Sequence, residues 1–143
     1  MSAWLLLHYK LPAHPSALRV YAWRKMKRLG AILVTDVIWV LPDTPRAAEQ
    51  FQWLTAEIQE MGGEAYLWRS SLVLGAQEEK LTAQFSQQVE REYASLLKKL
   101  EKKKPNLAAL SREYQQIASQ DYFHSALGRQ VREKLLALRG GRA

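Results

Sequence analysis

Apolar residues change their spacing several times along the first 75 residues, and each change predicts a new element. A continuous apolar run over 4–9 has the length and bulk of a buried strand. From Ser16, apolar residues recur at helical spacing until Gly30, a residue type that favours the left-handed end of a helix. Two short runs rich in β-branched residues, 31–34 and 37–41, then predict a hairpin with a two-residue connection.

The next segment repeats the alternation of helix and strand. Thr44 before Pro45 is a strong helix start, because a hydroxyl cap precedes proline at the first helical position. Its apolar stripe consists of Ala47, Phe51, Leu54, Ile58 and Met61. Gly62-Gly63 ends this helix, and 64–69 predicts a fourth strand. The element order predicts an α+β, ferredoxin-like βαββαβ domain over 1–75, with a four-stranded antiparallel sheet and two helices on one face.

Beyond residue 75 the apolar spacing is helical throughout. One stripe runs from Leu81 to Leu100. Asn106 fits the cap of a second helix, and Asp121 is interpreted as the start of a third. We therefore expect residues 76–143 to form an all-α extension of about three helices, packed on the first domain or on a second subunit.

Composition narrows the classes of function. The net charge of +7 at pH 7 favours polyanions or small anions as partners. Cysteine is absent, which excludes thiol catalysis and thiolate metal sites, and the three histidines are too scattered for a metal site. We expect no cofactor and no metal. No apolar run has the roughly 20 residues that span a bilayer, and no leader is recognisable, so the cytoplasm is the expected location.

The main candidate site is the basic helix that begins at Ser16. Its five cations are Arg19, Arg24, Lys25, Lys27 and Arg28, and no acid precedes Asp36 in the chain. Helical spacing places Arg19, Trp23 and Lys27 in one row, with Arg24 and Arg28 in the adjacent row. Cations interleaved with an indole suit phosphate contact and stacking, so these two rows are the candidate nucleic-acid-binding residues. The alternative interpretation is a solvated helix face with Trp23 at the edge of the core.

Other charged groups are weaker candidates. The lysines of 98–104 lie at a predicted helix C-terminus, where cations complement the helix dipole. Asp36 and Asp43 flank a predicted strand and are a possible Mg²⁺ pair for a nuclease, although both positions are ordinary turn chemistry. The sequence contains no Ser-His-Asp set and no glycine-rich phosphate loop. The chain is therefore expected not to be an enzyme.

The chain carries, in order, the segments WLLL, SALRVYAWRKMKRLGA, WVLPD, GGEAYLW, REYASLL and IASQDYF. This series resembles the N-terminal region of the chromate-resistance ChrB regulator family over nearly the whole chain. The resemblance implies a cytoplasmic, dimeric transcription factor that binds the promoter DNA of a chromate-efflux operon. Chromate would relieve the repression of this operon. The family's C-terminal sensing region has no counterpart in this sequence. We expect either a stand-alone relative or part of a longer regulator.

Two further resemblances and hypotheses remain open. The first half is similar in outline to small CRISPR-associated endoribonucleases and to the middle domain of phenylacetate-operon repressors. Those nucleases carry an aspartate where this chain has His8-Tyr9-Lys10, so that resemblance implies a nuclease-like fold without activity. An oxyanion-sensing module is the other alternative, with Arg19 near the helix start as the candidate residue for chromate or sulfate. A dimerisation module that binds a protein partner is a further possibility.

Overall fold

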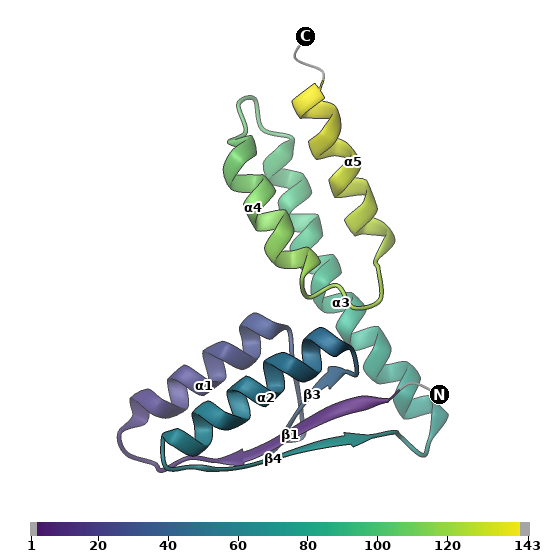
Figure 1. Ribbon diagram of the computed structural model, residues 1–143. Helices are drawn as coiled ribbons and strands as arrows, with labels where there is room; N and C mark the ends of the chain where they lie inside the picture. Colours follow the sequence, from purple (N-terminus) through teal and green to yellow (C-terminus); the bar gives the residue numbers. More distant parts are fainter. Residues whose placement is uncertain (1–2, 141–143) are drawn as a thin grey trace. The chain divides into compact units, whose positions relative to one another are not determined.

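The computed structural model describes residues 3–140, and the first part of the chain forms a four-stranded antiparallel sheet with two helices. The elements are β1 (Trp4–Lys10), α1 (Ser16–Leu29), β2 (Ile32–Val34), β3 (Ile38–Pro42), α2 (Pro45–Glu60) and β4 (Glu64–Ser70). The strands lie in the order β2-β3-β1-β4, and each neighbouring pair is antiparallel. This arrangement confirms the predicted ferredoxin-like fold (Figure 1).

Helices α1 and α2 lie side by side over one face of the sheet (Figure 1). Side chains alternate between the two faces along each strand. The sheet side of this core consists of the buried residues Leu5 and Leu7 of β1 and Trp39 and Leu41 of β3, which are paired in register. Helix α2 contributes the buried residues Phe51, Leu54 and Ile58. This core fixes which side of each helix faces inward.

Local signals set the helix ends. Gly30 ends α1 with a φ of 79°, and its N–H donates to the Lys27 carbonyl oxygen at 3.1 Å. Thr44 caps α2, because its side-chain oxygen accepts the Ala47 N–H at 3.1 Å. Pro15 occupies the cap position of α1, and the helix begins at Ser16 as predicted. Capping chemistry therefore identifies these helix ends to within about one residue.

The hairpin between β2 and β3 is longer than predicted. The sequence favoured a two-residue connection, whereas Thr35, Asp36 and Val37 all lie outside the strands. Thr35 adopts a φ of 56°, so the turn reaches the left-handed conformation of longer hairpin loops without a glycine. Val37 is 52% exposed. Its β-branched side chain favoured a strand position that the backbone does not give it.

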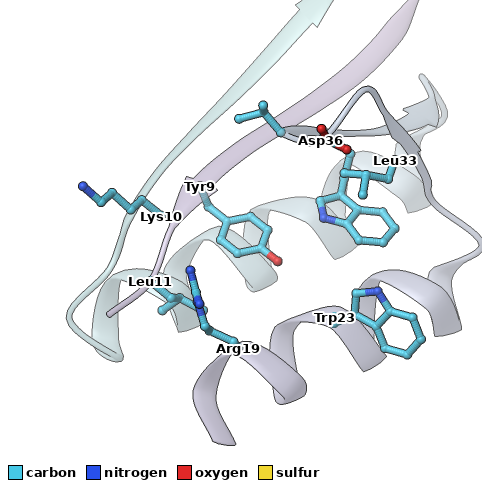
Figure 2. A pocket seen from close by; sticks show the side chains of 9 residues that line it. Tyr9, Lys10, Leu11, Arg19, Trp23, Leu33 and Asp36 are labelled. Atoms are coloured by element: carbon cyan, nitrogen blue, oxygen red, sulfur yellow. The ribbon is translucent and has the colours of Figure 1, made fainter. Parts of the chain in front are cut away.

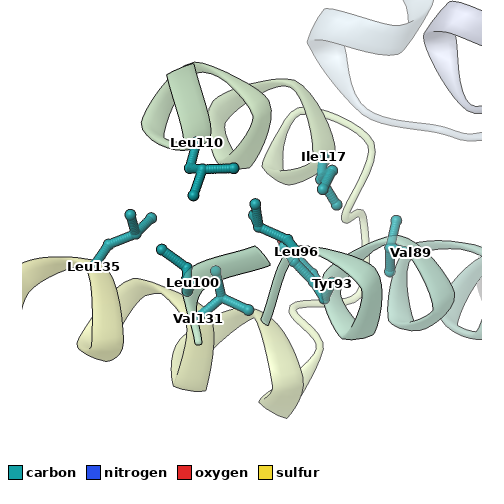
Figure 3. Packing of buried hydrophobic residues seen from close by; sticks show 8 residues of the cluster. All are labelled: Val89, Tyr93, Leu96, Leu100, Leu110, Ile117, Val131 and Leu135. Atoms are coloured by element: carbon teal, nitrogen blue, oxygen red, sulfur yellow. The ribbon is translucent and has the colours of Figure 1, made fainter. Parts of the chain in front are cut away.

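The chain divides into two compact units after Gly75, and the second unit is helical. Its helices are α3 (Gly75–Leu100), α4 (Leu107–Ala118) and α5 (Ala126–Gly140). They enclose the core shown in Figure 3, which consists of Val89, Tyr93, Leu96, Leu100, Leu110, Ile117, Val131 and Leu135. Asn106 caps α4 as predicted, since its side-chain oxygen accepts the Ala109 N–H at 3.1 Å.

Asp121 does not begin the last helix, which starts at Ala126. Its carboxylate accepts the Ser125 N–H at 3.0 Å and the Tyr93 hydroxyl at 3.1 Å. Burial, and then the neighbouring Asp121 carboxylate, raise the pKa of Tyr93, so the phenol remains a protonated donor. Asp121 therefore fastens the turn before α5 to α3.

Gly63 lets the turn before β4 approach β1 closely. A Cβ at this position would lie 2.6 Å from the Lys10 carbonyl oxygen and 2.9 Å from the Ile58 Cγ2. We predict that Gly63→Ala lowers the free energy of unfolding by about 1–3 kcal/mol, measured by urea denaturation with tryptophan fluorescence. Gly75→Ala is the matched control, because its Cβ would meet no atom within 4 Å. Equal stability of the two variants would contradict this packing.

Candidate nucleic-acid interface

Helix α1 buries a narrow stripe and leaves most of its surface to solvent. Its buried residues are Ala22 and Met26, at the i, i+4 spacing that places two side chains on one face. Leu18 and Leu29 are half-buried beside them. Because α1 packs through so few positions, the remaining side chains of the helix are exposed.

The five cations of α1 are all exposed. The helix contains no acid, and within residues 3–140 no ion pair joins Arg19, Arg24 or Lys27 to a carboxylate. The Nζ of Lys27 lies 5.8 Å from the centroid of the Trp23 ring, which is a cation–π geometry. The Lys27 charge therefore lies beside an aromatic ring, and the helix supplies no acid to pair with it.

Trp23 belongs to this exposed surface. It is 52% exposed, so about half of its surface is open to solvent. Its ring stands between Arg19 and Lys27 along one row of the helix, and Arg24 and Arg28 form the next row. The structure thus brings all five predicted residues onto one helix. We call this set, together with Lys25, the basic face of α1.

A hydrogen bond connects α1 to α2 beside the basic face. The Tyr21 hydroxyl donates to the Glu57 carboxylate, and this bond is the main reason that the pKa of Tyr21 is raised. The phenol is therefore a neutral donor at physiological pH. The Lys25 Nζ lies 5.5 Å from the centroid of the Tyr21 ring, so one cation of α1 lies beside this contact.

A pocket of about 410 Å³ opens beside α1, next to the end of β1 and the β2–β3 hairpin (Figure 2). Its lining residues are Tyr9, Lys10, Leu11, Arg19, Trp23, Leu33, Asp36, Val37 and Trp39. Arg19 and Trp23 of the basic face therefore form one wall of this pocket. The volume is in the range of sites for small molecules.

The pocket combines two cations, one acid and aromatic walls. Lys10 and Arg19 are positive, and Asp36 offsets one of these charges. Burial raises the pKa of Tyr9, while a hydrogen bond with Trp39 and the charge of Arg19 act in the opposite direction. An indole N–H can only donate, so the Tyr9 oxygen accepts this bond and keeps its own proton for another acceptor. An anion matches this set of donors.

One acidic and one lysine candidate, Asp43 and Lys99, form ion pairs of their own. Asp43 accepts a 2.6 Å hydrogen bond from the Arg69 Nε, which engages one carboxylate of the candidate Mg²⁺ pair. Within residues 3–140 no group of three or more metal-ligating side chains is found. In the lysine-rich segment, the Lys99 Nζ lies 2.9 Å from the Glu113 carboxylate. No helix in the described part of the chain is long and apolar enough to cross a membrane.

The sequence indicates the basic face but not the pocket beside it. Tyr9 and Lys10 come from the end of β1 and Asp36 from the hairpin, so no local motif joins them to Arg19. The polar end of an otherwise apolar strand is the signal that sequence reasoning did not use for binding. Only the assembled sheet places this strand end beside α1.

Comparison with known proteins now places these residues in a family. A family model described as "Protein ChrB, N-terminal" matches residues 19–138, which include the basic face, the hairpin and most of the helical unit. The chain belongs to this ChrB family. Protein ChrB of Cupriavidus metallidurans is 30% identical over 89 residues, which are 62% of this chain and 28% of that protein. The chain therefore spans little more than a quarter of that ChrB relative. No solved structure matches.

Proposed function

We propose that this chain is the DNA-binding part of a chromate-resistance transcription regulator, which acts in the cytoplasm as a homodimer on an operon promoter. The observation that carries the proposal is the basic face of α1, where five cations are exposed on a helix without an acid. Membership of the ChrB family supports the connection to chromate resistance. The regulator binds and releases DNA, and we propose no bond-breaking step for it.

The basic face suits contact with DNA phosphates. Each cation that neutralises a phosphate releases a condensed counterion, so the affinity depends steeply on salt. Arg24 and Arg28 can each hold phosphate oxygens with a planar guanidinium fork. Trp23, with Lys27 against its ring, adds a flat surface for a sugar or a base. These contacts fix the position of the protein on DNA, and base contacts read the sequence.

Neutralising part of the basic face should weaken DNA binding. We predict that Arg24→Gln/Lys27→Gln/Arg28→Gln lowers the affinity for a promoter duplex, because it removes three positive charges that can contact phosphate. These three residues lie outside the pocket, so the pocket lining is unchanged. If each contacts one phosphate, the slope of log K against log salt falls by about 0.9 per residue, measured by fluorescence anisotropy over roughly 50–200 mM salt.

The matched control removes three positive charges from the helical unit. Lys102, Lys103 and Lys104 are exposed, and their triple change to glutamine lowers the net charge by the same amount. The proposal predicts a much smaller loss of affinity for this control. An equal loss in both variants, or wild-type binding that is indifferent to salt, would contradict a specific role for the basic face.

The pocket supports a second candidate function, the binding of a small oxyanion such as chromate. Lys10 and Arg19 supply charge to its lining, and the Tyr9 hydroxyl has a proton to donate. Because Arg19 belongs to both the pocket and the basic face, an anion bound there would compete with DNA for this residue. Such competition is a direct route from an inducer to release of DNA.

Asp36 should oppose anion binding. We predict that Asp36→Asn binds chromate and sulfate roughly fivefold more tightly, because removing a nearby like charge is worth about 1 kcal/mol near a protein surface. Arg19→Gln should abolish the binding, and Glu49→Gln, on the exposed surface of α2, is the control acid-to-amide change. Titration calorimetry measures all four proteins. The absence of heat with both anions, in the wild type and in Asp36→Asn, would remove this function.

A further inference from the structure

Strand β4 forms an edge of the sheet. It pairs with β1 over seven consecutive residue pairs, from Glu64 opposite Lys10 to Ser70 opposite Trp4. No strand within residues 3–140 pairs with its outer side. The opposite edge, β2, has three residues, against seven in β4. A long edge strand presents unpaired backbone donors and acceptors that can template another strand.

The edge strand lacks the usual protection against such pairing. It contains no proline and no lysine, and its unbroken register with β1 leaves no bulge. Its charged residues, Glu64 and Arg69, stand near its two ends. Between them, Tyr66 and Trp68 are 59% and 56% exposed on the same face.

We propose that β4 pairs antiparallel with β4 of a second copy of this chain and joins the two sheets into one of eight strands. This inference deepens the proposed homodimer by naming its surface. An antiparallel pair centred on Leu67 is symmetric about a two-fold axis. It places Tyr66 opposite Trp68 of the second copy, twice in each dimer, and aromatic cross-strand pairs stabilise sheets.

Charge and ring geometry favour a second copy over nucleic acid as the occupant. Glu64 and Arg69 leave β4 with no net charge, so this edge does not attract a polyanion as the basic face does. Antiparallel self-pairing brings the acidic end of each strand to the basic end of its partner. The rings of Tyr66 and Trp68 already lie 6.4 Å apart, with His8 6.3 Å from Tyr66. Self-pairing extends this aromatic row across the dimer.

Cysteine cross-linking tests the register, because the chain has no cysteine of its own. In an antiparallel pair, hydrogen-bonded and non-hydrogen-bonded positions alternate, and the side chains of the latter lie closer. Either Leu67→Cys or an equimolar mixture of the single variants Tyr66→Cys and Trp68→Cys therefore places thiols at such a close pair, and the mixture keeps one Tyr66–Trp68 pair in each mixed dimer. We expect either Leu67→Cys or this mixture to form a disulfide-linked dimer under mild oxidation. Trp53→Cys, at a 64% exposed position on α2, should remain uncrosslinked.

The second test places a charge on the edge. Trp68→Lys should shift the protein from dimer to monomer in size-exclusion chromatography with light scattering, and its circular dichroism should remain unchanged because Trp68 is exposed. Trp53→Lys on α2 is the matched control and should remain dimeric. A wild type that is monomeric at all soluble concentrations would overturn the proposal. The proposal would also be overturned if the wild type is a dimer, Trp68→Lys remains dimeric and no cysteine substitution on β4 gives a cross-link.

The outcomes separate this interface from the proposed function. A monomer that still binds promoter DNA through the basic face overturns the β4 interface and leaves the regulator intact. A cross-linked dimer that binds no DNA supports the interface and contradicts the regulator. A third outcome is a monomeric wild type whose tryptophan fluorescence is quenched by an oligothymidine, with the quenching lost in Trp68→Lys. This result would assign the surface to single-stranded nucleic acid and overturn the proposal.

Discussion

The burial of Ala22 and Met26 decides where the charge of α1 lies. A helix packed on a sheet can bury one stripe, and turning α1 to bury another would take an arginine or a lysine out of water at a large cost in free energy. The core beneath α1 therefore directs all five cations outward. The Tyr21 contact with Glu57 adds a second attachment of α1 to α2. Both the basic face and the pocket depend on this orientation.

The sequence predicts those features that short-range chemistry determines. Periodicity is enough to give the order of the elements, and hence the ferredoxin-like sheet, because one face of each strand and one stripe of each helix must be apolar. Gly30, Thr44 and Asn106 end or begin helices through hydrogen bonds to residues within a turn. The basic face is predictable for the same reason, since a helix converts spacing directly into a surface.

The remaining features depend on contacts between distant segments. Asp121 is a residue type that favours a helix start, but the last helix begins later, at Ala126. The Asp121 carboxylate instead accepts hydrogen bonds from the Tyr93 hydroxyl and from the following turn. The pocket joins a strand end, a hairpin and a helix, and the register that brings them together is not visible in any one segment. Tryptophan combines a large apolar ring with a polar N–H and occurs at interfaces as well as in cores, so periodicity could not separate the buried Trp39 from the exposed Trp23 and Trp68.

Lysine acetylation footprinting by mass spectrometry tests the central claim most directly, because the chain carries reactive lysines on the basic face and away from it. The claim is that α1 holds DNA through cations that its packing forces outward. With a saturating promoter duplex, Lys25 and Lys27 should become protected, while Lys102, Lys103 and Lys104 should remain as reactive as in the free protein. Protection of the 102–104 lysines with Lys25 and Lys27 still fully reactive would contradict the account.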